Sequence, residues 1–184
     1  AVYSPKDKLP WDDAVTLALS YAEIPYEIIY DREIIEGKLS DYDWLHLHHE
    51  DFTGQYGKFY GAYHHTAWYR NQVRNAEEEA RLLGYEKVSK LKLAVALTIK
   101  SYVQQGGFLF SMCSGTDSFD IALASHKTDI CADMFDGDPI DPNCQQMLDF
   151  DSTLAFTDFT LSQNPNEYEF SNIDATQTRK VNKT

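Results

Sequence analysis

Up to residue 126, apolar and polar residues alternate with two periods, one typical of strands and the other typical of helices. Short apolar runs predict strands at residues 2–3, 26–30, 42–48 and 108–112. Between these runs, apolar residues recur every three or four positions and predict helices over residues 12–22, 31–36, 63–83, 87–105 and 116–124. Because strands and helices alternate, we expect an α/β fold whose mainly parallel sheet is covered by helices on both faces.

Two of these elements carry specific expectations about burial. The helix over 12–22 is expected to begin at Asp12 as its N-cap, and its inward stripe is Val15, Ala18, Leu19 and Ala22. The run over 108–112 predicts a central parallel strand that is buried on both faces.

Beyond His126 the composition changes and the helical periodicity fades. Residues 127–158 hold eight aspartates, and short strands are expected at 154–156 and 168–170. The polar stretch 176–184 is expected to fray. We therefore expect one domain over residues 1–184, with an α/β core at 1–126, an acidic turn- and strand-rich completion at 127–175, and a tail.

The net charge of −13, from 16 basic and 29 acidic side chains, disfavours contact with nucleic acid or with an anionic membrane. No apolar run approaches the roughly 18 residues that a membrane-spanning helix requires. A small molecule is therefore the expected partner, and the sequence leaves a homo-oligomer open.

Three cysteines, at positions 113, 131 and 144, match neither a disulfide framework nor a zinc ribbon. This favours a reducing compartment such as the cytoplasm. No signal-peptide pattern precedes the first strand, although a cleaved signal would leave no trace. Because the sequence opens almost at once on the apolar strand AVYS, we also expect a further segment upstream.

The stretch GGFLFSMCSGTDSF, residues 106–119, places Cys113 where a strand gives way to a helix. Ligands of parallel sheets bind beyond the carboxyl ends of the strands, and the N-terminus of the next helix stabilises a thiolate. Gly115 allows the helix and the strand to approach closely. Cys113 is therefore a candidate nucleophile, and a small buried side chain without reactivity is the alternative.

The order of elements from Leu91 to Ala124 (helix, Gly-Gly, apolar strand, Cys-x-Gly, helix) resembles the nucleophile region of the class I glutamine amidotransferase-like superfamily, which includes the DJ-1/PfpI and ThuA-like branches. The resemblance implies a flavodoxin-like three-layer α/β sandwich. It also implies Cys113 as a nucleophile at a sharp turn, with the backbone of Ser114 and Gly115 beside it and the Ser114 N–H holding the oxyanion.

The chain departs from this family in two places. Amidotransferases of this class carry a His-x-Glu after a late strand, and no histidine follows His126 here. They also have a Pro-Gly-Gly-like turn where this chain has the sequence HHED, residues 48–51. The resemblance therefore implies either a cysteine-dependent hydrolase or amidotransferase acting on a small amide or carbonyl, or a non-catalytic ThuA-like module that binds a sugar or metabolite.

A second resemblance concerns the segment SGTDS, residues 114–118. It is similar to the Ser-Gly-Gly-x-Asp-Ser pyrophosphate loop of ATP-pyrophosphatases such as asparagine synthetase B, although it is one residue shorter. The shorter loop offers fewer backbone N–H groups to a pyrophosphate, and the N-terminal nucleophilic cysteine of that enzyme is absent from this sequence.

Histidines gather near the end of the third predicted strand. Alternation places Trp44, His46 and His48 on one face of the strand and His49 on the opposite face. His48 or His49 could activate Cys113, with Glu50 orienting the imidazole. The imidazoles of His46, His48 and His49 could instead bind a divalent metal such as zinc, or serve the structure alone.

The residues around these histidines have the composition of a ligand-binding wall. The candidate ligand-binding residues are Trp44, His46, Phe52, Tyr56 and Tyr60. The acidic segment 135–143 offers Asp136, Asp138 and Asp141 as oxygen ligands for calcium, but it lacks a complete EF-hand loop. We expect solvated turns there, and no cofactor other than the divalent metal considered for the histidines.

Overall fold

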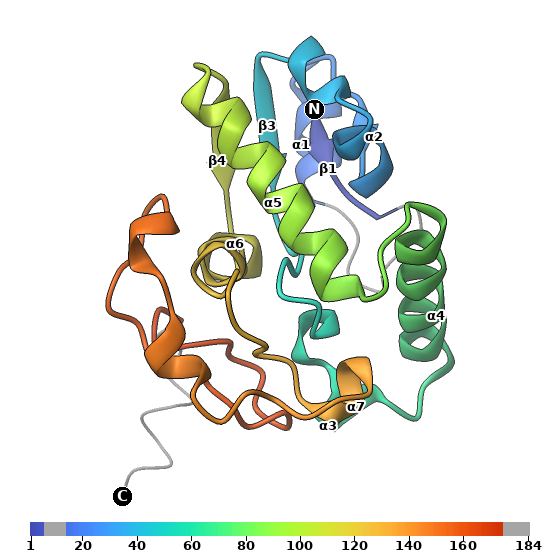
Figure 1. Ribbon diagram of the computed structural model, residues 1–184. Helices are drawn as coiled ribbons and strands as arrows, with labels where there is room; N and C mark the ends of the chain where they lie inside the picture. Colours follow the sequence, from blue (N-terminus) through green and yellow to red (C-terminus); the bar gives the residue numbers. More distant parts are fainter. Residues whose placement is uncertain (6–13, 175–184) are drawn as a thin grey trace, which may run out of the picture.

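The computed structural model describes residues 1–5 and 14–174. Within them, four parallel strands form one sheet in the order β2-β1-β3-β4. The strands are β1 (Val2–Tyr3), β2 (Ile28–Ile29), β3 (Trp44–Leu47) and β4 (Phe108–Ser111) (Figure 1). The chain is thus an α/β protein with a parallel sheet, as the hydrophobic pattern predicts.

Seven α-helices are present in the described residues. They are α1 (Ala14–Tyr21), α2 (Asp31–Ile35), α3 (Tyr60–Tyr63), α4 (Ala67–Leu82), α5 (Val88–Gln104), α6 (Ser114–Ala124) and α7 (Asp133–Asp136). Short 3₁₀ turns lie at Lys38–Asp41, Tyr56–Lys58, Cys144–Met147 and Phe150–Ser152. None of the described helices combines the length and the apolarity needed to cross a membrane. The predicted helices are confirmed, except that the one over 63–83 begins later and is preceded by α3.

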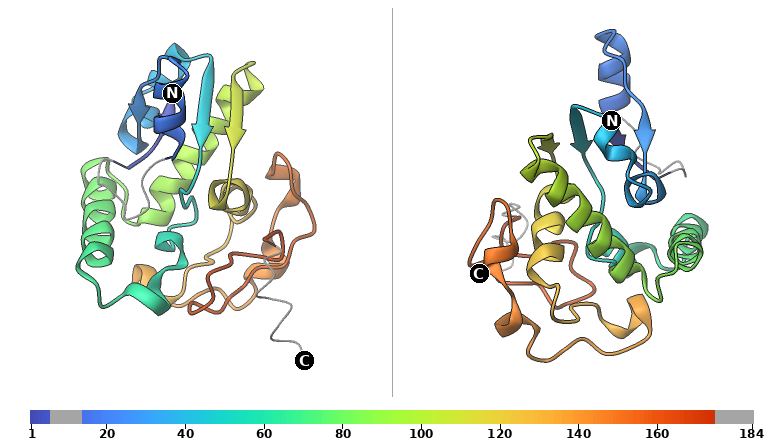
Figure 2. Two further views of the ribbon diagram at one scale, coloured as in Figure 1. Left: turned by 180° about the vertical axis from the view of Figure 1, so that it is seen from behind. Right: turned by 45° about the horizontal axis from the view of Figure 1, so that its top comes forward.

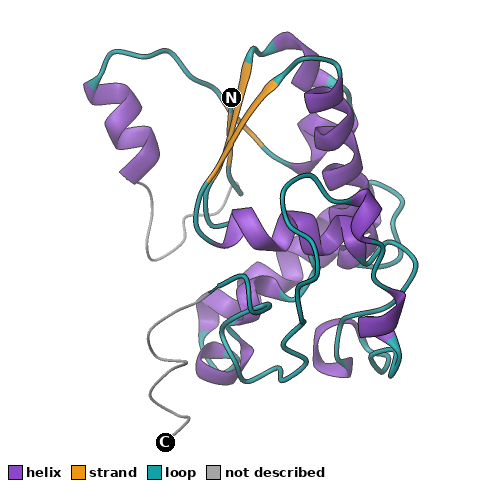
Figure 3. Ribbon diagram, turned by 90° about the vertical axis from the view of Figure 1, so that its left-hand side faces the viewer, coloured by secondary structure: helices purple, strands orange, loops and turns teal. Residues whose placement is uncertain are grey.

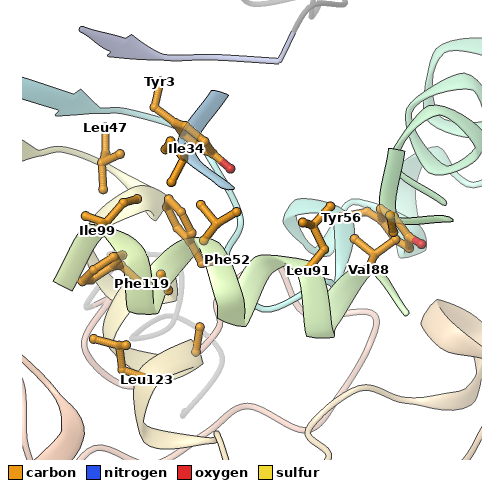
Figure 4. Packing of buried hydrophobic residues seen from close by; sticks show 14 of the residues in the cluster. Tyr3, Ile34, Leu47, Phe52, Tyr56, Val88, Leu91, Ile99, Phe119 and Leu123 are labelled. Carbon is orange, nitrogen blue, oxygen red and sulfur yellow. The ribbon is translucent and has the colours of Figure 1, made fainter. Parts of the chain in front are cut away.

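The main core lies between the sheet and α5, which crosses one of its faces (Figure 1). From α5, Leu91, Val95 and Ile99 are at most 1% exposed, as their helical spacing predicts. Leu45 and Leu47 of β3 are fully buried. Figure 4 shows Ile99 close to Leu47. Burial of each such side chain stabilises the fold by about 1.5–3 kcal/mol, which is why periodicity identifies these elements so well.

On the opposite face of the sheet, Val2 and His46 are buried, but within the described residues the face is exposed along β4 (Figure 2). Phe108 and Phe110 of β4 are 58% and 43% exposed, and β4 is an edge strand among the described strands. The prediction that 108–112 is a central strand buried on both faces is therefore wrong. A short apolar run is compatible with a central or an edge position, because its pattern reports hydrophobicity and not its number of neighbours.

Helix α1 does not cover this open face as expected. It stands apart from the sheet in Figure 3, and none of its residues is buried. Of the predicted inward stripe, Val15 and Leu19 are only half-buried and Ala18 and Ala22 are exposed, so the predicted burial of this stripe is wrong. The apolar spacing specifies a helix but not the surface against which it packs. The predicted N-cap, Asp12, lies outside the described residues.

We call residues 1–126 the α/β half and residues 127–174 the C-terminal segment. Within the described residues, the C-terminal segment forms one isolated antiparallel bridge, Leu161–Ser171, so the strands predicted at 154–156 and 168–170 are wrong. Side chains replace the missing strand pairing. The carboxylate of Asp120 in α6, only 1% exposed, accepts the backbone N–H groups of Leu154, Ala155 and Phe156, each at 2.8 Å. The predicted tail at 176–184 lies outside the described residues.

Candidate functional site

Cys113 occupies a strained turn between β4 and α6. Its backbone angles are φ 51° and ψ −140°, a combination that non-glycine residues rarely adopt. The residue is the N-cap of the eleven-residue helix α6, and it is exposed. Strain of this kind costs about 1–3 kcal/mol and is found most often at functional sites. The predicted exposure of the thiol at a strand-to-helix turn is observed.

The Cys113 turn lies directly against the HHED segment after β3. The Gly115 N–H donates to the carbonyl oxygen of His48 at 3.0 Å, and the Ser114 hydroxyl donates to that of His49 at 2.8 Å. A Cβ atom on Gly115 would come within 2.9 Å of the His48 carbonyl oxygen, so glycine allows this approach. The two segments therefore share one rim of the sheet, as the sequence predicts.

The two backbone groups considered for an oxyanion differ in their hydrogen bonding. The Gly115 N–H is already donated to His48. Ser114 is the first residue of α6, and in the part of the chain that the structure describes its N–H has no acceptor. Because the first N–H groups of a helix have no partner within it, this group can donate a hydrogen bond to a negatively charged oxygen.

Asp117, in the first turn of α6, is a buried acid that sequence reasoning missed. It is 5% exposed, and its Oδ1 accepts the N–H of Ser118 at 2.9 Å. Its Oδ2 is buried without a hydrogen-bond partner among the described residues. Burial, with smaller contributions from Asp174 and Asp51, raises the pKa of Asp117 to about 7. A carboxyl group that titrates near neutrality can hold or release a proton at physiological pH.

Tyr168 is the second unexpected neighbour, and it comes from the C-terminal segment. Burial and then the charge of Cys113, followed by those of Asp174 and Asp117, raise the pKa of the Tyr168 hydroxyl. The segment is held there by Lys58, which is 3% exposed and donates to the carbonyl oxygens of Ser162 and Glu169, each at 2.9 Å. A contact between residues so far apart in sequence leaves no local signal that could have predicted it.

The histidines are brought together, but not as the alternation predicts. His46 and His48 share a face, with ring centroids 6.2 Å apart, and His46 stacks on Phe110 at 5.3 Å. His49 stacks on His48 at 3.5 Å, so its predicted place on the opposite face is wrong. The reason is that β3 ends at Leu47, after which strand alternation no longer applies.

Glu50 and Cys113 were expected to complete a catalytic unit with His48 or His49. One carboxylate oxygen of Glu50 accepts the backbone N–H of His48 at 2.7 Å, which fixes the turn after β3. Within the described residues, the Cys113 sulfur makes no hydrogen bond to an imidazole. Catalytic hydrogen bonds often tighten only when substrate is bound, so activation by a histidine stays a prediction.

The five candidate ligand-binding residues are spread over different surroundings. Trp44 lies on the open face of the sheet, edge-on to Phe108 at 6.0 Å, and His46 lies beside Phe110. Phe52 is fully buried between Tyr3 and Phe119 (Figure 4). Tyr60 stacks on His64 at 4.9 Å. Tyr56 lines a cavity of about 640 Å³ between the loop after β3, α4 and α5.

Among the described residues, Asp129, Cys131 and Asp136 place potential metal ligands within 4.8 Å of one another. The Lys87 ammonium group already lies between these carboxylates, at 3.1 Å from Asp129 and 3.0 Å from Asp136, and Asp138 also accepts from it. A lysine thus already occupies this cluster and offsets part of its negative charge. Zinc at the histidines stays a prediction, and calcium at the acidic segment was not expected.

The SGTDS segment, residues 114–118, forms the first turns of α6 and is not a loop. Three of its N–H groups are already donated, that of Gly115 to His48, that of Thr116 to Cys113 and that of Ser118 to Asp117, which disfavours the resemblance to a pyrophosphate loop. In comparisons with known proteins, no family model, curated protein or solved structure matches the chain.

Proposed function

We propose that this protein is a cysteine-dependent hydrolase or amide-nitrogen transferase for a small amide, with a flavodoxin-like fold of the class I glutamine amidotransferase-like kind. The observation that supports this most directly is the backbone of Cys113, at φ 51° and ψ −140°. A strained turn of this kind exposes a nucleophile at the top of a parallel sheet, in front of a helix N-terminus.

The proposed reaction begins with attack of the Cys113 thiolate on the carbonyl carbon of the amide. A carbon–sulfur bond forms, and the carbonyl electron pair moves to the oxygen, which accepts a hydrogen bond from the Ser114 N–H. The carbon–nitrogen bond then breaks, and the leaving amine takes a proton. Water cleaves the resulting thioester, which releases the acid and restores the thiol.

Asp117 is the proposed source of the proton for the leaving amine. With its pKa raised to about 7 by burial, a large share of this carboxyl group is protonated at neutral pH. His48 or His49, next to Glu50, retains the predicted role of accepting the thiol proton. With Asp117 as the acid and His48 or His49 as the base, the site has both groups although no histidine follows His126.

Alkylation and amide hydrolysis test the proposal together. We expect iodoacetamide to modify Cys113 at least tenfold faster than it modifies glutathione at pH 7, and the Cys113→Ala variant to lose ammonia release from a panel of small amides, beginning with glutamine. The buried thiols of Cys131 and Cys144 serve as internal controls. Ordinary alkylation together with hydrolysis that survives in Cys113→Ala would reject the proposal.

A non-catalytic binding module is the second candidate function. It is favoured by the absence of a hydrogen bond between the Cys113 sulfur and an imidazole in the described part of the chain. Such a module would tolerate Cys113→Ala without loss of ligand affinity, and it would lose affinity when Tyr56 in the cavity is replaced.

A further inference from the structure

The cavity beside Tyr56 lies where parallel sheets bind ligands. Its walls include Pro5 after β1, Tyr30 after β2 and Asp51 after β3. From β1 the chain first forms β2 on one side of β1 and then β3 on the other side. Ligands bind at such a reversal, beyond the carboxyl ends of the strands, and the volume of about 640 Å³ falls within the usual range for small-molecule sites.

Aromatic rings form a large part of the wall. Four of them line the cavity: Tyr30, Tyr56, Phe59 and Trp68. Phe59 and Trp68 meet edge-on, with centroids 6.0 Å apart, so these two rings form no parallel slot for a flat base. Val88 at the start of α5 also lines the cavity, and Figure 4 shows it next to Tyr56. Aromatic faces attract cations as well as apolar groups.

The charged side chains of the wall are mostly acidic. Four carboxylates line the cavity, those of Glu50, Asp51, Glu78 and Glu79, against two cations, Arg74 and Lys92. The charge of Glu79 is offset by Arg32, which donates to both of its oxygens at 3.0 Å.

Both cations are already bonded within the protein. The Lys92 ammonium group donates to the hydroxyls of Tyr3 and Tyr30 and to the carboxylate of Asp31, which uses its three protons. Arg74 donates to the side chain of Asn71 at 2.6 Å. A negatively charged ligand would therefore meet an unfavourable field.

Hydrogen-bond acceptors remain available on α4. The side-chain oxygen of Gln72 is buried and accepts no hydrogen bond within the described residues. Glu78 is exposed, and its nearest cation, Arg81, is 4.0 Å away. A wall with negative charge, available acceptors and aromatic faces suits a ligand that is positive and can only donate.

We infer that this cavity binds an alkyl ammonium ion, such as a polyamine. The ammonium group donates to Gln72 and Glu78 against the aromatic wall, and the alkyl chain lies along Tyr56 and Val88. The inference goes beyond the proposed function, because Cys113 is not among the described residues that line the cavity. A nucleoside phosphate is disfavoured by the charge of the wall.

Calorimetric titration of the full chain with spermidine, near physiological ionic strength, tests this inference. We expect saturable binding with a stoichiometry of one, weakened about tenfold by Trp68→Ala and about fivefold by Glu78→Gln. Glu36→Gln is the matched control, because Glu36 is also exposed, pairs loosely with Lys38 at 3.6 Å and does not line the cavity. We expect it to change the affinity less than about twofold.

Three results would overturn the inference. The first is the absence of saturable binding of spermidine and of choline. The second is an equal loss of affinity in Glu78→Gln and Glu36→Gln, which would indicate diffuse attraction to a chain of net charge −13. The third is tighter binding of a neutral saccharide, such as maltose, than of spermidine. Because Trp68→Ala also removes packing, the isosteric Glu78→Gln variant decides between these outcomes.

Discussion

The α/β half and the C-terminal segment of this chain are held by different kinds of contact. In the α/β half, strands pair backbone to backbone and α5 buries a regular apolar stripe against them. In the C-terminal segment, single polar side chains hold the backbone in place. Gln145, for example, donates to the carbonyl oxygen of Phe159 at 3.0 Å and accepts the N–H of Leu161 at 2.8 Å.

Because of this difference, the stability of the C-terminal segment depends on a few polar side chains. A strand ladder divides its hydrogen bonds among many residues, and the loss of one side chain leaves the ladder intact. A side chain that satisfies several backbone groups has no substitute, because each buried group left without a partner costs about 1–3 kcal/mol. In the C-terminal segment, a single polar substitution should therefore destabilise only the surrounding backbone. In the α/β half, we expect the largest loss of stability where the substitution leaves a buried charge without its partner.

The largest effect is expected at the buried ion pair of the α/β half. Lys92 and Asp31 are 4% and 2% exposed, and their charged atoms are 2.8 Å apart. Lys92→Met leaves Asp31 buried without its cation, so we expect a loss of about 3–5 kcal/mol in the free energy of unfolding, measured with urea. Lys90→Met, at an exposed position of the same helix, is the control. A loss below 1 kcal/mol would contradict this prediction.

The next effect is expected at Asp120, the anchor of the C-terminal segment. Asp120→Ala removes the acceptor of three backbone N–H groups, so we expect a loss of about 2–4 kcal/mol. Hydrogen exchange should quicken over residues 150–174 and change little over α5. Asp151→Ala, at an exposed site, should change neither region. Uniform quickening over the whole chain would mean that the two regions unfold as one unit.

The pH dependence of stability tests an interaction between the two regions. Asp117 lies in the α/β half, and its pKa is affected by Asp174 of the C-terminal segment. Its folded pKa of about 7 is above the unfolded value of 3.8. Between pH 4 and 7 the unfolded chain releases this proton while the folded chain keeps it, so the free energy of unfolding falls as pH rises. We expect this fall, about 4 kcal/mol, to disappear in Asp117→Asn. Parallel pH profiles of the two proteins would contradict the assignment.

The smallest effect is expected in α1, an eight-residue helix without buried residues. Leu17→Ser should change the free energy of unfolding by less than about 0.5 kcal/mol, because Leu17 is 72% exposed. Leu91→Ala, at a buried position of α5, should cost about 2–5 kcal/mol in the same urea experiment. Similar losses in the two variants would indicate that Leu17 is covered in solution.

The sequence predicts most of the fold because hydrophobic periodicity reflects burial by a neighbouring element. It predicts the strands, the helices and the meeting of Cys113 with the HHED segment at one rim. It fails for Phe110 and for the stripe of α1 that includes Ala18, since apolar spacing does not say whether a face is covered. It also fails to predict Tyr168 as a neighbour of Cys113, because the placement of Tyr168 depends on contacts such as that of Lys58 with Glu169, which spans 111 positions.

Lys58 also determines the order in which the region around Cys113 can assemble. Its two acceptors, the carbonyls of Ser162 and Glu169, lie 104 and 111 positions further along the chain. On the ribosome, the sheet, α5 and the thiol of Cys113 can therefore emerge well before Tyr168 is synthesised. The nascent chain thus passes through an interval in which this sulfur, which is exposed in the finished protein as well, still lacks its tyrosine neighbour.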